Sequence, residues 1–320
     1  MIKKTLIKFL RSGLNTSLQG APINNLQHLG ITTSGPMDNF LSKIGNISLD
    51  NQEETLCFEI CRLGPKIQIL EGIFIFLISG NVNFDIISEY KLIKGRCNQS
   101  YTIKKGDKID IKTTINSNYG YLIFKGQLED KIINNLSSSI LSSSLGVNQG
   151  KKILDSDEFR LSTITNFKKR KLDINIQKYY KNIIRVLPGP QMHYFKIKNI
   201  NKFFNKKFKI SKNSNRVGIR LLENTIKSTL NNNISSEGII KGSIQIPGDG
   251  NPIILASEHP TIGGYPKIAS IIMTDFAKIV QLEEGTDVFF EAVNIETAEK
   301  EYFKLKKLLK NLKKNIVYLQ

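Results

Sequence analysis

The chain has 320 residues, 40% hydrophobic and 23% charged, a balance typical of an ordinary globular protein. Its formal net charge of +18 suggests nucleic-acid binding. The lysines are spread along the chain, however, and the sequence has no tryptophan, no aromatic stacking motif and no zinc-knuckle spacing. We therefore expect no nucleic-acid partner.

Membrane and secretory signals are also missing from the sequence. The N-terminal segment is short and interrupted by lysines, unlike a signal peptide. No apolar run approaches the roughly 18 residues that cross a bilayer. Cys57, Cys61 and Cys97 are odd in number, which indicates free thiols in a reducing compartment. We expect a cytoplasmic protein without a membrane partner.

The first half of the chain is predicted to be mainly strands, with one early helix. Pro36 after Ser34 is suited to a first helical turn. The apolar residues that follow have helical spacing: Met37, Phe40, Leu41, Ile44 and Ile47. The segment Ile73–Ser79 is apolar but short, which predicts a buried strand. Residues 134–144 form a serine-rich polar stretch that we expect to be a loop.

A turn that leads into a strand recurs along the chain. Residues 105–111 and 284–290 share this pattern, and residues 154–161 are a weaker relative. Short strands separated by Gly, Asn, Asp and Ser favour an all-β barrel or sandwich. Repeated β units are consistent with this pattern.

The second half opens after a basic, polar stretch at residues 166–181, which is the best boundary. A strand is predicted over 183–187 and a helix over 191–204. A last helix is predicted over 296–314, with one apolar stripe: Tyr302, Leu305, Leu309, Leu312 and Ile316. Its lysine-rich faces favour packing on its own domain or a partner over packing on a membrane. We expect units at 1–175 and 176–295, then a C-terminal helix at 296–320.

The most informative segment follows two predicted strands at 242–247 and 252–256. It contains Gly263, Gly264, Tyr265, Pro266 and Lys267. Adjacent glycines let backbone N–H groups approach a ligand. The proline stiffens the turn, and the lysine supplies a mobile cation at its end. This combination suits capture of a carboxylate, although a solvated surface lysine is the ordinary alternative.

Two further polar residues lie near predicted strands of the same half. Arg216 follows a polar turn, where its guanidinium either grips a carboxylate through two hydrogen bonds or forms a surface pair. Gln245 alternates with Ile244 and Ile246, so its amide lines a pocket or faces water. Ser243 is expected to be structural.

Candidates in the first half have similarly mixed interpretations. His28 precedes Leu29-Gly30, and Asp38 lies where a carboxylate favours a helix N-terminus. Glu59, between Phe58 and Ile60, is the carboxylate that we expect at a pocket edge. The three histidines, His28, His193 and His259, lack partners at ligand spacing, so no metal site is expected.

The standard catalytic motifs are missing. The sequence has no G-x-x-x-x-G-K-[ST] loop, no strand–GxGxxG–helix unit and no G-x-S-x-G elbow. Any nucleotide is therefore bound without either standard phosphate cradle.

Taken together, several segments resemble the carboxyltransferase A/B family, which includes KipA, the C subunit of 5-oxoprolinase and subunit 2 of allophanate hydrolase or urea amidolyase. The resemblance is nearly collinear from Gly13 to about Val293. The matching motifs are Gln27-His28-Leu29-Gly30, Ser34-Gly35-Pro36-Met37-Asp38, Glu59 with Gly64-Pro65, Arg185–Gln191, Arg216–Leu221, Ser236-Glu237-Gly238, Gln245-Ile246-Pro247 and Gly263–Ala269.

The resemblance implies a mainly β fold of two cyclophilin-like β-barrel subdomains with a few helices. It also implies a KipI-like B subunit as partner, with the site near their junction, and a LamB/YcsF-like A subunit. Its members act in ATP-dependent opening of 5-oxoproline to glutamate, or in biotin-linked carboxyl transfer to urea. The substrate-binding residues that it implies include Ser34.

This chain departs from the family pattern at four polar positions. A T-V-Q-D-x-G-R-type segment has Gly20 and Ile23 in place of its acid and arginine. The S-D-R-M-G pattern has Asn215 in place of its carboxylate, and the D-x-Q-T pattern has Pro260 in place of its amide. A G-S-R-S-T-like loop is replaced by Asn135-Leu136-Ser137-Ser138-Ser139.

Three functional hypotheses follow. The favoured one is a 5-oxoprolinase-type hydrolase subunit, in which Lys267, Gln245 and Arg216 act on a small carboxylate or lactam. The second is a component of a biotin-dependent carboxyltransferase. The third is a regulatory or scaffold partner without catalytic activity, which the lost polar groups support.

Overall fold

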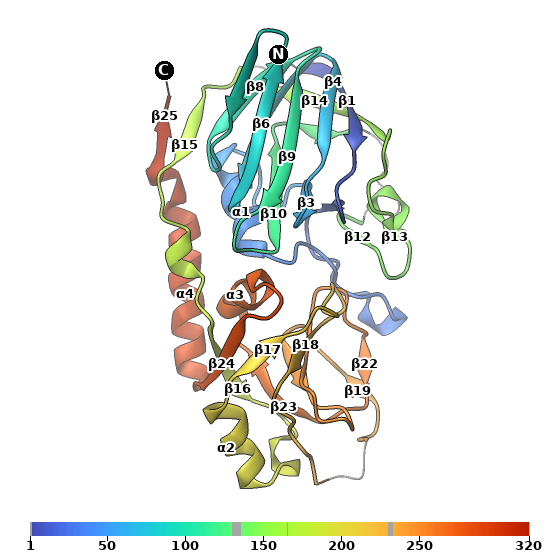
Figure 1. Ribbon diagram of the computed structural model, residues 1–320, viewed down its shortest axis with the longest axis vertical. Coiled ribbons are helices and arrows are strands. Elements are labelled where there is room, and N and C mark those ends of the chain that lie inside the picture. The colour runs from blue at the N-terminus through green and yellow to red at the C-terminus, as the bar shows by residue number, and fades with distance from the viewer. Residues whose placement is uncertain (1, 130–135, 165, 230–232, 320) are drawn as a thin grey trace. The chain divides into compact units, whose positions relative to one another are not determined.

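The computed structural model describes residues 2–129, 136–164, 166–229 and 233–319. Its contacts divide the chain into two units (Figure 1). Unit 1 comprises residues 1–22, 38–176 and 308–320, and unit 2 comprises residues 23–37 and 177–307. Asn134 and Asn135 of the predicted polar loop lie outside the described residues.

Unit 1 is built on two β-sheets. Among the described residues, one sheet has seven strands in the order β11-β14-β1-β4-β9-β6-β7, and the other has five in the order β2-β3-β10-β5-β8. The strands are β1 (Ile2–Arg11), β2 (Ser17–Gln19), β3 (Cys57–Cys61), β4 (Lys66–Glu71), β5 (Ile73–Ser79), β6 (Val82–Ser88), β7 (Lys91–Lys94), β8 (Ser100–Lys104), β9 (Lys108–Thr114), β10 (Tyr119–Phe124), β11 (Gln127–Leu128) and β14 (Glu158–Ile164). Two short pairs are β12 (Ser139–Ile140) with β13 (Leu145–Gly146) and β15 (Arg170–Leu172) with β25 (Ile316–Tyr318).

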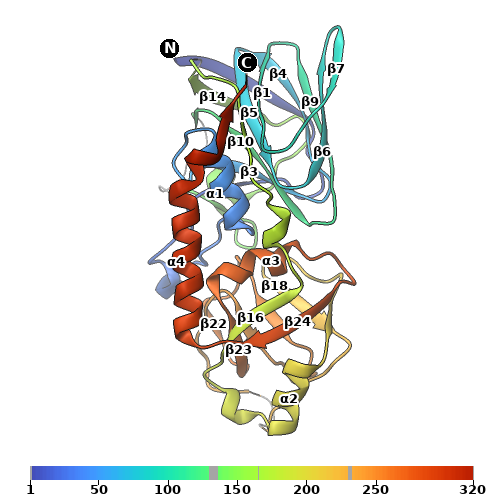
Figure 2. The same cartoon turned by 90° about the vertical axis from the view of Figure 1, so that its left-hand side faces the viewer.

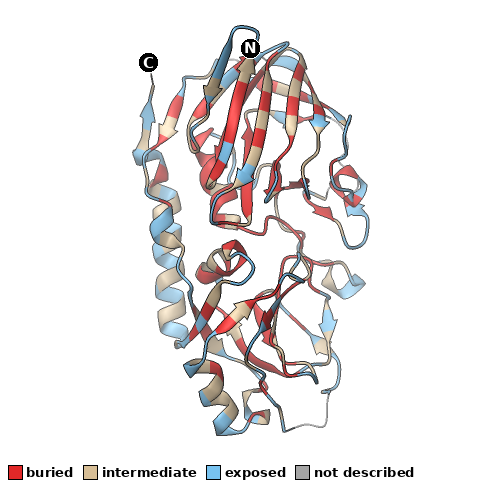
Figure 3. Cartoon of the chain, viewed as in Figure 1, coloured by how far each residue is buried: buried red, intermediate tan, exposed pale blue. Residues whose placement is uncertain are grey.

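The core of unit 1 lies between these two sheets. Phe9 on β1 packs against Phe58 on β3, with ring centroids 5.2 Å apart. Phe159 on β14 contacts both rings at 5.6 Å. Buried and more exposed residues alternate along β4, β9 and β14 of the seven-stranded sheet, whereas β3, β5 and β10 of the five-stranded sheet are buried at nearly every position (Figure 3). The predicted strand Ile73–Ser79 is confirmed, and it is buried along most of its length.

Unit 2 contains a closed barrel. Its strands, in ring order, are β16 (Ile183–Pro188), β23 (Lys267–Ile271), β20 (Ser243–Gln245), β21 (Ile253–Leu255), β18 (Gly218–Leu222), β17 (Phe208–Ile210) and β24 (Asp287–Ala292). A short pair, β19 (Glu237–Gly238) with β22 (Ile262–Gly263), lies outside this ring. The predicted mainly β fold is confirmed. Of the two predicted barrels, the one in unit 2 is a closed barrel, whereas the described strands of unit 1 form two separate main sheets.

Helices are few among the described residues. They are α1 (Asn39–Ser48) in unit 1, α2 (Ile197–Asn205) and α3 (Phe276–Gln281) in unit 2, and α4 (Ile295–Asn311), within which the division between the units falls. Helix α2 packs on β24, where the Phe203 and Phe290 rings stack 4.6 Å apart (Figure 2). None of the described helices is both long and apolar enough to cross a membrane.

The predicted start of the first helix was wrong. Ser34 and Gly35 have positive φ angles of 47° and 84°, so the backbone is not helical there. The helix begins after Asp38, whose carboxylate accepts a hydrogen bond from the Leu41 N–H at 3.0 Å. The Asp38 side chain thus caps the start of the helix, whereas we expected Pro36 to lie in its first turn. The apolar stripe itself is confirmed, because Phe40, Leu41, Ile44 and Ile47 are all buried.

Other predicted elements shifted at their boundaries. The second helix begins at Ile197, after a 3-10 turn at Met192–Tyr194. The last helix ends at Asn311, and a 3-10 turn at Leu312–Asn315 follows. The polar stretch at 166–181 contributes the edge strand β15, so it is not only a connection.

Cys57, Cys61 and Cys97 are free thiols, and burial raises the pKa of Cys57.

A buried carboxylate holds the barrel of unit 2 together at β16. Asp275 is fully buried and accepts hydrogen bonds from the Arg185 guanidinium at 2.7 and 2.9 Å and from the Arg185 backbone N–H at 3.0 Å. Lys278 lies 2.9 Å from the same carboxylate. Burial alone raises the pKa of Asp275, but the hydrogen bonds from Arg185 and Lys278 outweigh it and lower the pKa.

Replacing Asp275→Asn should lower the free energy of unfolding at pH 7 by about 3 kcal/mol, because Lys278 and Arg185 lose this buried carboxylate, although Arg185 keeps its ion pair with Glu301 at 3.0 Å. A carboxylate with a lowered folded pKa stabilises fully above its unfolded pKa of about 4 and loses this effect as the pH falls through the folded value. In urea unfolding, the difference in the free energy of unfolding between the natural chain and the variant should therefore become smaller as the pH falls from 5 to 3. A difference that is constant over this range would contradict the assignment.

Candidate functional site

Lys267 begins strand β23 of the barrel and is buried. Its side chain is 4% exposed, and its ammonium lies 2.6 Å from Oε1 of Glu237. The prediction that Lys267 is a mobile cation was therefore wrong, and so was the alternative of a solvated surface lysine. Because Lys267 starts a strand that pairs on both sides, with β16 and β20, its backbone is fixed and its ammonium is held beside one partner.

Glu237 and Gln191 complete the surroundings of Lys267. The Gln191 side-chain amide donates a hydrogen bond to Glu237 Oε1 at 2.9 Å, and its carbonyl accepts one from the Lys267 backbone N–H at 3.2 Å. The Lys267 ammonium and the Gln191 amide lower the pKa of Glu237. Glu237 is therefore ionised at neutral pH, and its side chain is 42% exposed.

The turn before Gln191 fits closely against β23. The Gly189 N–H donates to the Ile268 carbonyl at 2.9 Å. A Cβ atom at Gly189 would lie 2.3 Å from the Lys267 carbonyl oxygen, closer than any real contact. Glycine is therefore required here by the close approach of two backbones, and this approach brings Gln191 to Lys267.

The remaining predicted residues of this turn lie around the same lysine. Gln245 is the cross-strand neighbour of Lys267, beside a bulge in β20. Its Oε1 lies 3.7 Å from the position that a Cβ of Gly263 would take. Gly264 accepts a hydrogen bond from the Ile234 N–H, and buried Pro266 accepts one from the Ile246 N–H. Tyr265 is 37% exposed.

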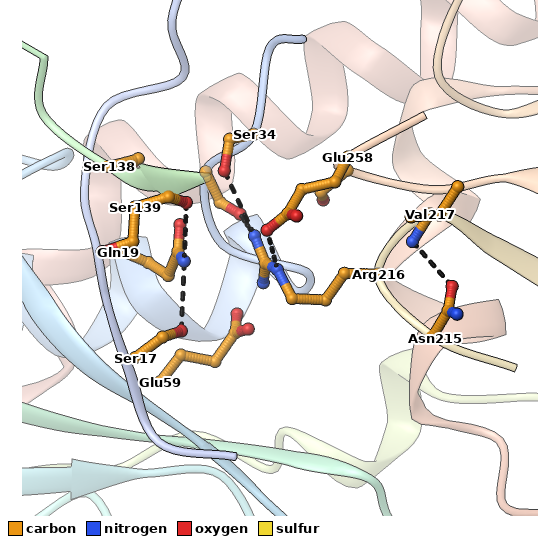
Figure 4. Close-up of polar contacts among 12 residues, drawn as sticks. Ser17, Gln19, Ser34, Glu59, Ser138, Ser139, Asn215, Arg216, Val217 and Glu258 are labelled. Atoms are coloured by element: carbon orange, nitrogen blue, oxygen red, sulfur yellow. Dashed lines mark hydrogen bonds and ion pairs between the residues drawn. The ribbon is translucent and has the colours of Figure 1, made fainter. Parts of the chain in front are cut away.

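Arg216 belongs to a second group in unit 2. Its Nε donates to Glu258 Oε1 at 2.6 Å, and its Nη2 donates to the Gly35 carbonyl at 2.8 Å and to Ser34 Oγ at 3.4 Å (Figure 4). Glu258 is 1% exposed on its side chain and Arg216 is 11% exposed. The arginine thus fastens the segment around Ser34, including its left-handed backbone, to the barrel.

Two of the departures from the family pattern flank this group. Asn215 Oδ1 accepts hydrogen bonds from the Val217 and Gly218 N–H groups at 2.9 and 3.1 Å, which maintains the turn before Arg216 (Figure 4). The Pro260 carbonyl lies 2.6 Å from His259 Nδ1, which must carry the proton because a carbonyl only accepts. Burial lowers the pKa of His259, so the ring is neutral.

Glu59 and Asp38 belong to a third group, in unit 1. The Tyr121 hydroxyl donates to Glu59 Oε2 at 2.8 Å and accepts from the Asp38 N–H at 2.8 Å. All three residues are buried, with exposures of 1% or less. Burial raises the pKa of Tyr121, and the neighbouring carboxylates raise it further. Asp38 therefore serves the helix cap and this chain of hydrogen bonds together.

A further departure, Gly20, lies beside a buried polar cluster of unit 1. Its N–H donates to Ser138 Oγ at 2.9 Å, and a Cβ there would lie 2.6 Å from the Ser137 carbonyl oxygen. The neighbouring Gln19 amide donates to Ser17 Oγ and to the Ser139 carbonyl (Figure 4). The serine loop thus occupies the space that an acid at position 20 would need.

The structure therefore sorts the predicted site residues into three groups. Lys267, Gln245 and the 263–266 turn lie together, Arg216 and Ser34 form the second group, and Asp38 and Glu59 the third. His28 lies on the exposed 3-10 turn Gln27–Leu29, apart from these contacts. Within the described residues no group of three His, Cys, Asp or Glu side chains is placed to hold a metal.

Sequence reasoning assigned no role to Glu237, Gln191 or Glu258. Glu237 and Gln191 stand in motifs that carried the family resemblance, and that was their only signal. Each meets its partner across a sequence separation of 30 to 76 residues. A pattern in one sequence does not report such distances.

Solved structures share this fold. Kluyveromyces lactis urea carboxylase matches with a TM-score of 0.85 and 22% identity over 98% of this chain and 31% of that one. The urea amidolyase of K. lactis matches with a TM-score of 0.84 and 22% identity, over 98% of this chain and 21% of that one. The architecture is therefore that of a segment within these larger enzymes.

The chain belongs to the family described as carboxyltransferase domain, subdomain A and B, whose model matches residues 29–292. It is 26% identical to the C subunit of 5-oxoprolinase from Escherichia coli, over 92% of this chain and 94% of that protein. Identity to the corresponding C subunit from Haemophilus influenzae is 28%, over 86% and 87%. Urea amidolyase of Saccharomyces cerevisiae is 25% identical, but the chain covers only 17% of it. The resemblance inferred from motifs is confirmed.

Replacing Gly189→Ala should lower the free energy of unfolding by about 1–3 kcal/mol, because the added methyl group overlaps the Lys267 carbonyl. Gly238→Ala is the matched control, since a Cβ there meets no atom within 4 Å. Urea unfolding curves of both variants measure the difference. Equal stability of the two variants would contradict the close approach.

Replacing Arg216→Met should lower the free energy of unfolding by about 3 kcal/mol, because Glu258 is left charged and buried. Adding Glu258→Met to this variant should recover part of the loss. A double-mutant cycle from urea unfolding measures the coupling. Strictly additive losses would contradict a direct pair.

Proposed function

We propose that this chain is a subunit of an ATP-dependent 5-oxoprolinase-type complex, which opens the lactam ring of 5-oxoproline to give glutamate. Two proteins named as the C subunit of 5-oxoprolinase match it over nearly their whole length, unlike the larger enzymes. The observation that carries the proposal is the buried ammonium of Lys267 beside the 263–266 turn. Such a cation suits a small substrate that bears a carboxylate.

In this proposal Lys267 binds the carboxylate of 5-oxoproline by charge and hydrogen bonding. The Gln245 amide, the cross-strand neighbour of Lys267, orients the lactam group. Neither group forms a covalent bond with substrate. Their contribution is electrostatic, from donors held in place before the substrate arrives.

The proposed role of Arg216 is to neutralise a second anionic group of a substrate or intermediate. Its guanidinium already pairs with Glu258 and with the Gly35 carbonyl. An anion would therefore share this arginine with Glu258. Positioning of the segment around Ser34 is the part of its role that the contacts support directly.

The proposed partners are a KipI-like B subunit and a LamB/YcsF-like A subunit. ATP is assigned to the complex, because this sequence has neither of the standard phosphate-binding loops. In this proposal no step of the reaction involves a nucleotide bound to this chain.

Co-purification with its neighbouring subunits, followed by an assay for glutamate released from 5-oxoproline, tests this function. Release that requires ATP and all subunits is the expected result. A stable complex without release in any mixture would instead support the regulatory or scaffold hypothesis.

Biotin-dependent carboxyl transfer is the second candidate, and the fold shared with urea carboxylase favours it. This sequence contains no biotin-carrier lysine motif, so the carrier and the carboxylase would lie outside it. A biotin carboxylase encoded beside this chain would support this alternative, whereas a LamB/YcsF-like neighbour would support the oxoprolinase.

Replacing Lys267→Met should lower kcat/KM for 5-oxoproline in the assembled complex at least about 100-fold, since the substrate carboxylate loses its cation. The fold should persist, because the Glu237 carboxylate is partly exposed to water. Lys209→Met is the matched control, since it removes an exposed lysine of the same barrel, paired with Glu223 at 2.6 Å. Unchanged turnover and substrate affinity in the Lys267 variant would refute this role.

A further inference from the structure

The Lys267 ammonium and the Gln191 side-chain amide both lie close to one oxygen atom. The Lys267 ammonium lies 2.6 Å from Glu237 Oε1, and the Gln191 amide donates to the same atom at 2.9 Å. A point that lies close to an ammonium and also accepts an amide N–H is a favourable position for a carboxylate oxygen. In this structure a side chain of the protein itself supplies that oxygen.

The hydrogen bonding of the lysine is incomplete. An ammonium has three N–H donors. The Lys267 Nζ is buried, yet it makes no hydrogen bond of normal geometry with any described residue. Its one close neighbour is the Glu237 carboxylate. A buried ammonium with unused donors is costly, so an acceptor that uses more of these donors than Glu237 does is favoured in its place.

The glutamate is held less firmly than the lysine. Lys267 lies on a strand paired on both sides, and its side chain is 4% exposed. Glu237 lies on the two-residue strand β19, and its side chain is 42% exposed. The side chain of Glu237 thus has water into which to move, whereas that of Lys267 does not.

We propose that Glu237 is an internal competitor for the anion site at Lys267, and that the carboxylate of a small ligand displaces it. The ligand oxygen then takes the position of Glu237 Oε1, between the Lys267 ammonium and the Gln191 amide, and Glu237 turns toward water. No covalent bond changes in this exchange. The inference rests on the proposed function only for the identity of the ligand, a small monocarboxylate such as 5-oxoproline.

In this arrangement a ligand occupies the site only if its interactions there are stronger than those of the Glu237 carboxylate. Two carboxylates at one ammonium repel each other, so a ligand binds only when Glu237 leaves. An anion that binds through its carboxylate alone gains little net binding free energy, because it only replaces the interactions that Glu237 already makes. A ligand with a second polar group, which Gln245 can bind, gains more. Glu237 therefore sets an affinity threshold in this proposal: it weakens the binding of every carboxylate by the same factor, and contacts such as those of Gln245 supply the discrimination.

The test is carboxylate binding to the isolated full chain, measured by isothermal titration calorimetry with L-5-oxoproline and with acetate as probes. Glu237→Gln should bind both probes at least about tenfold more tightly than the natural chain, a difference of about 1.4 kcal/mol. Glu237→Ala, which removes the occupant entirely, should bind at least as tightly as Glu237→Gln. The gain should be the same factor for both probes, because both displace the same occupant.

Two controls make the result specific. Glu223→Gln removes the same charge from another ion pair of this barrel, also 2.6 Å long, and should leave affinity unchanged. Adding Lys267→Met to Glu237→Ala should abolish the gain. Unchanged or weaker binding by both Glu237 variants would overturn the inference, as would an equal gain in the Glu223 variant.

The outcome is separable from that of the proposed function. If the Glu237 variants bind carboxylates more tightly but no complex releases glutamate, the exchange stands and the reaction assignment fails. If the complex releases glutamate while Glu237→Gln shows no gain in affinity, the function stands and the exchange fails.

Discussion

A lysine ammonium withdrawn from water needs a partner, and the barrel of unit 2 supplies one for Lys267. Burying an unpaired charge costs several kcal/mol, so the lysine tolerates its position only with a counter-ion. The backbone leaves no freedom to avoid this, because Lys267 begins a strand paired with both neighbours. Glu237, Gln191 and the glycine at 189 are arranged around that requirement.

Barrel closure brings these residues together. Strand β23 lies between β16 and β20, so the chain leaving β16 reaches Gln191 beside Lys267, and β20 ends at Gln245 on the other side. The β19–β22 pair then carries Glu237 and Gly263 in register. The segments around Gln191, Glu237 and Gln245 thus come together around Lys267. A change of register in a single strand would separate them, which links the fold directly to the candidate chemistry.

Much of the fold could be predicted from periodicity, whereas the site could be predicted only in part. The apolar runs at Ile73–Ser79 and in the first helix report their own burial, so both were found. The helix start was missed because Asp38 caps it through a side-chain hydrogen bond that composition does not distinguish from a proline start. Lys267 was expected to be mobile, since the sequence shows the lysine but not its pairing with Glu237, which lies 30 residues earlier. Burial and pairing depend on contacts that only the folded chain creates.

The departures from the family pattern have been accommodated by the surrounding structure. At Gly20 the Ser137 carbonyl and the Ser138 hydroxyl fill the space and satisfy the backbone, so restoring an acid there would require the serine loop to move. Asn215 loses a charge but retains the two backbone hydrogen bonds that shape the turn before Arg216. Glu258 still neutralises that arginine. Decay of an unused site would leave buried donors and cavities at such positions, whereas here each of these changed residues has defined partners. This pattern favours a region rebuilt around different polar contacts, with Lys267 buried beside Glu237.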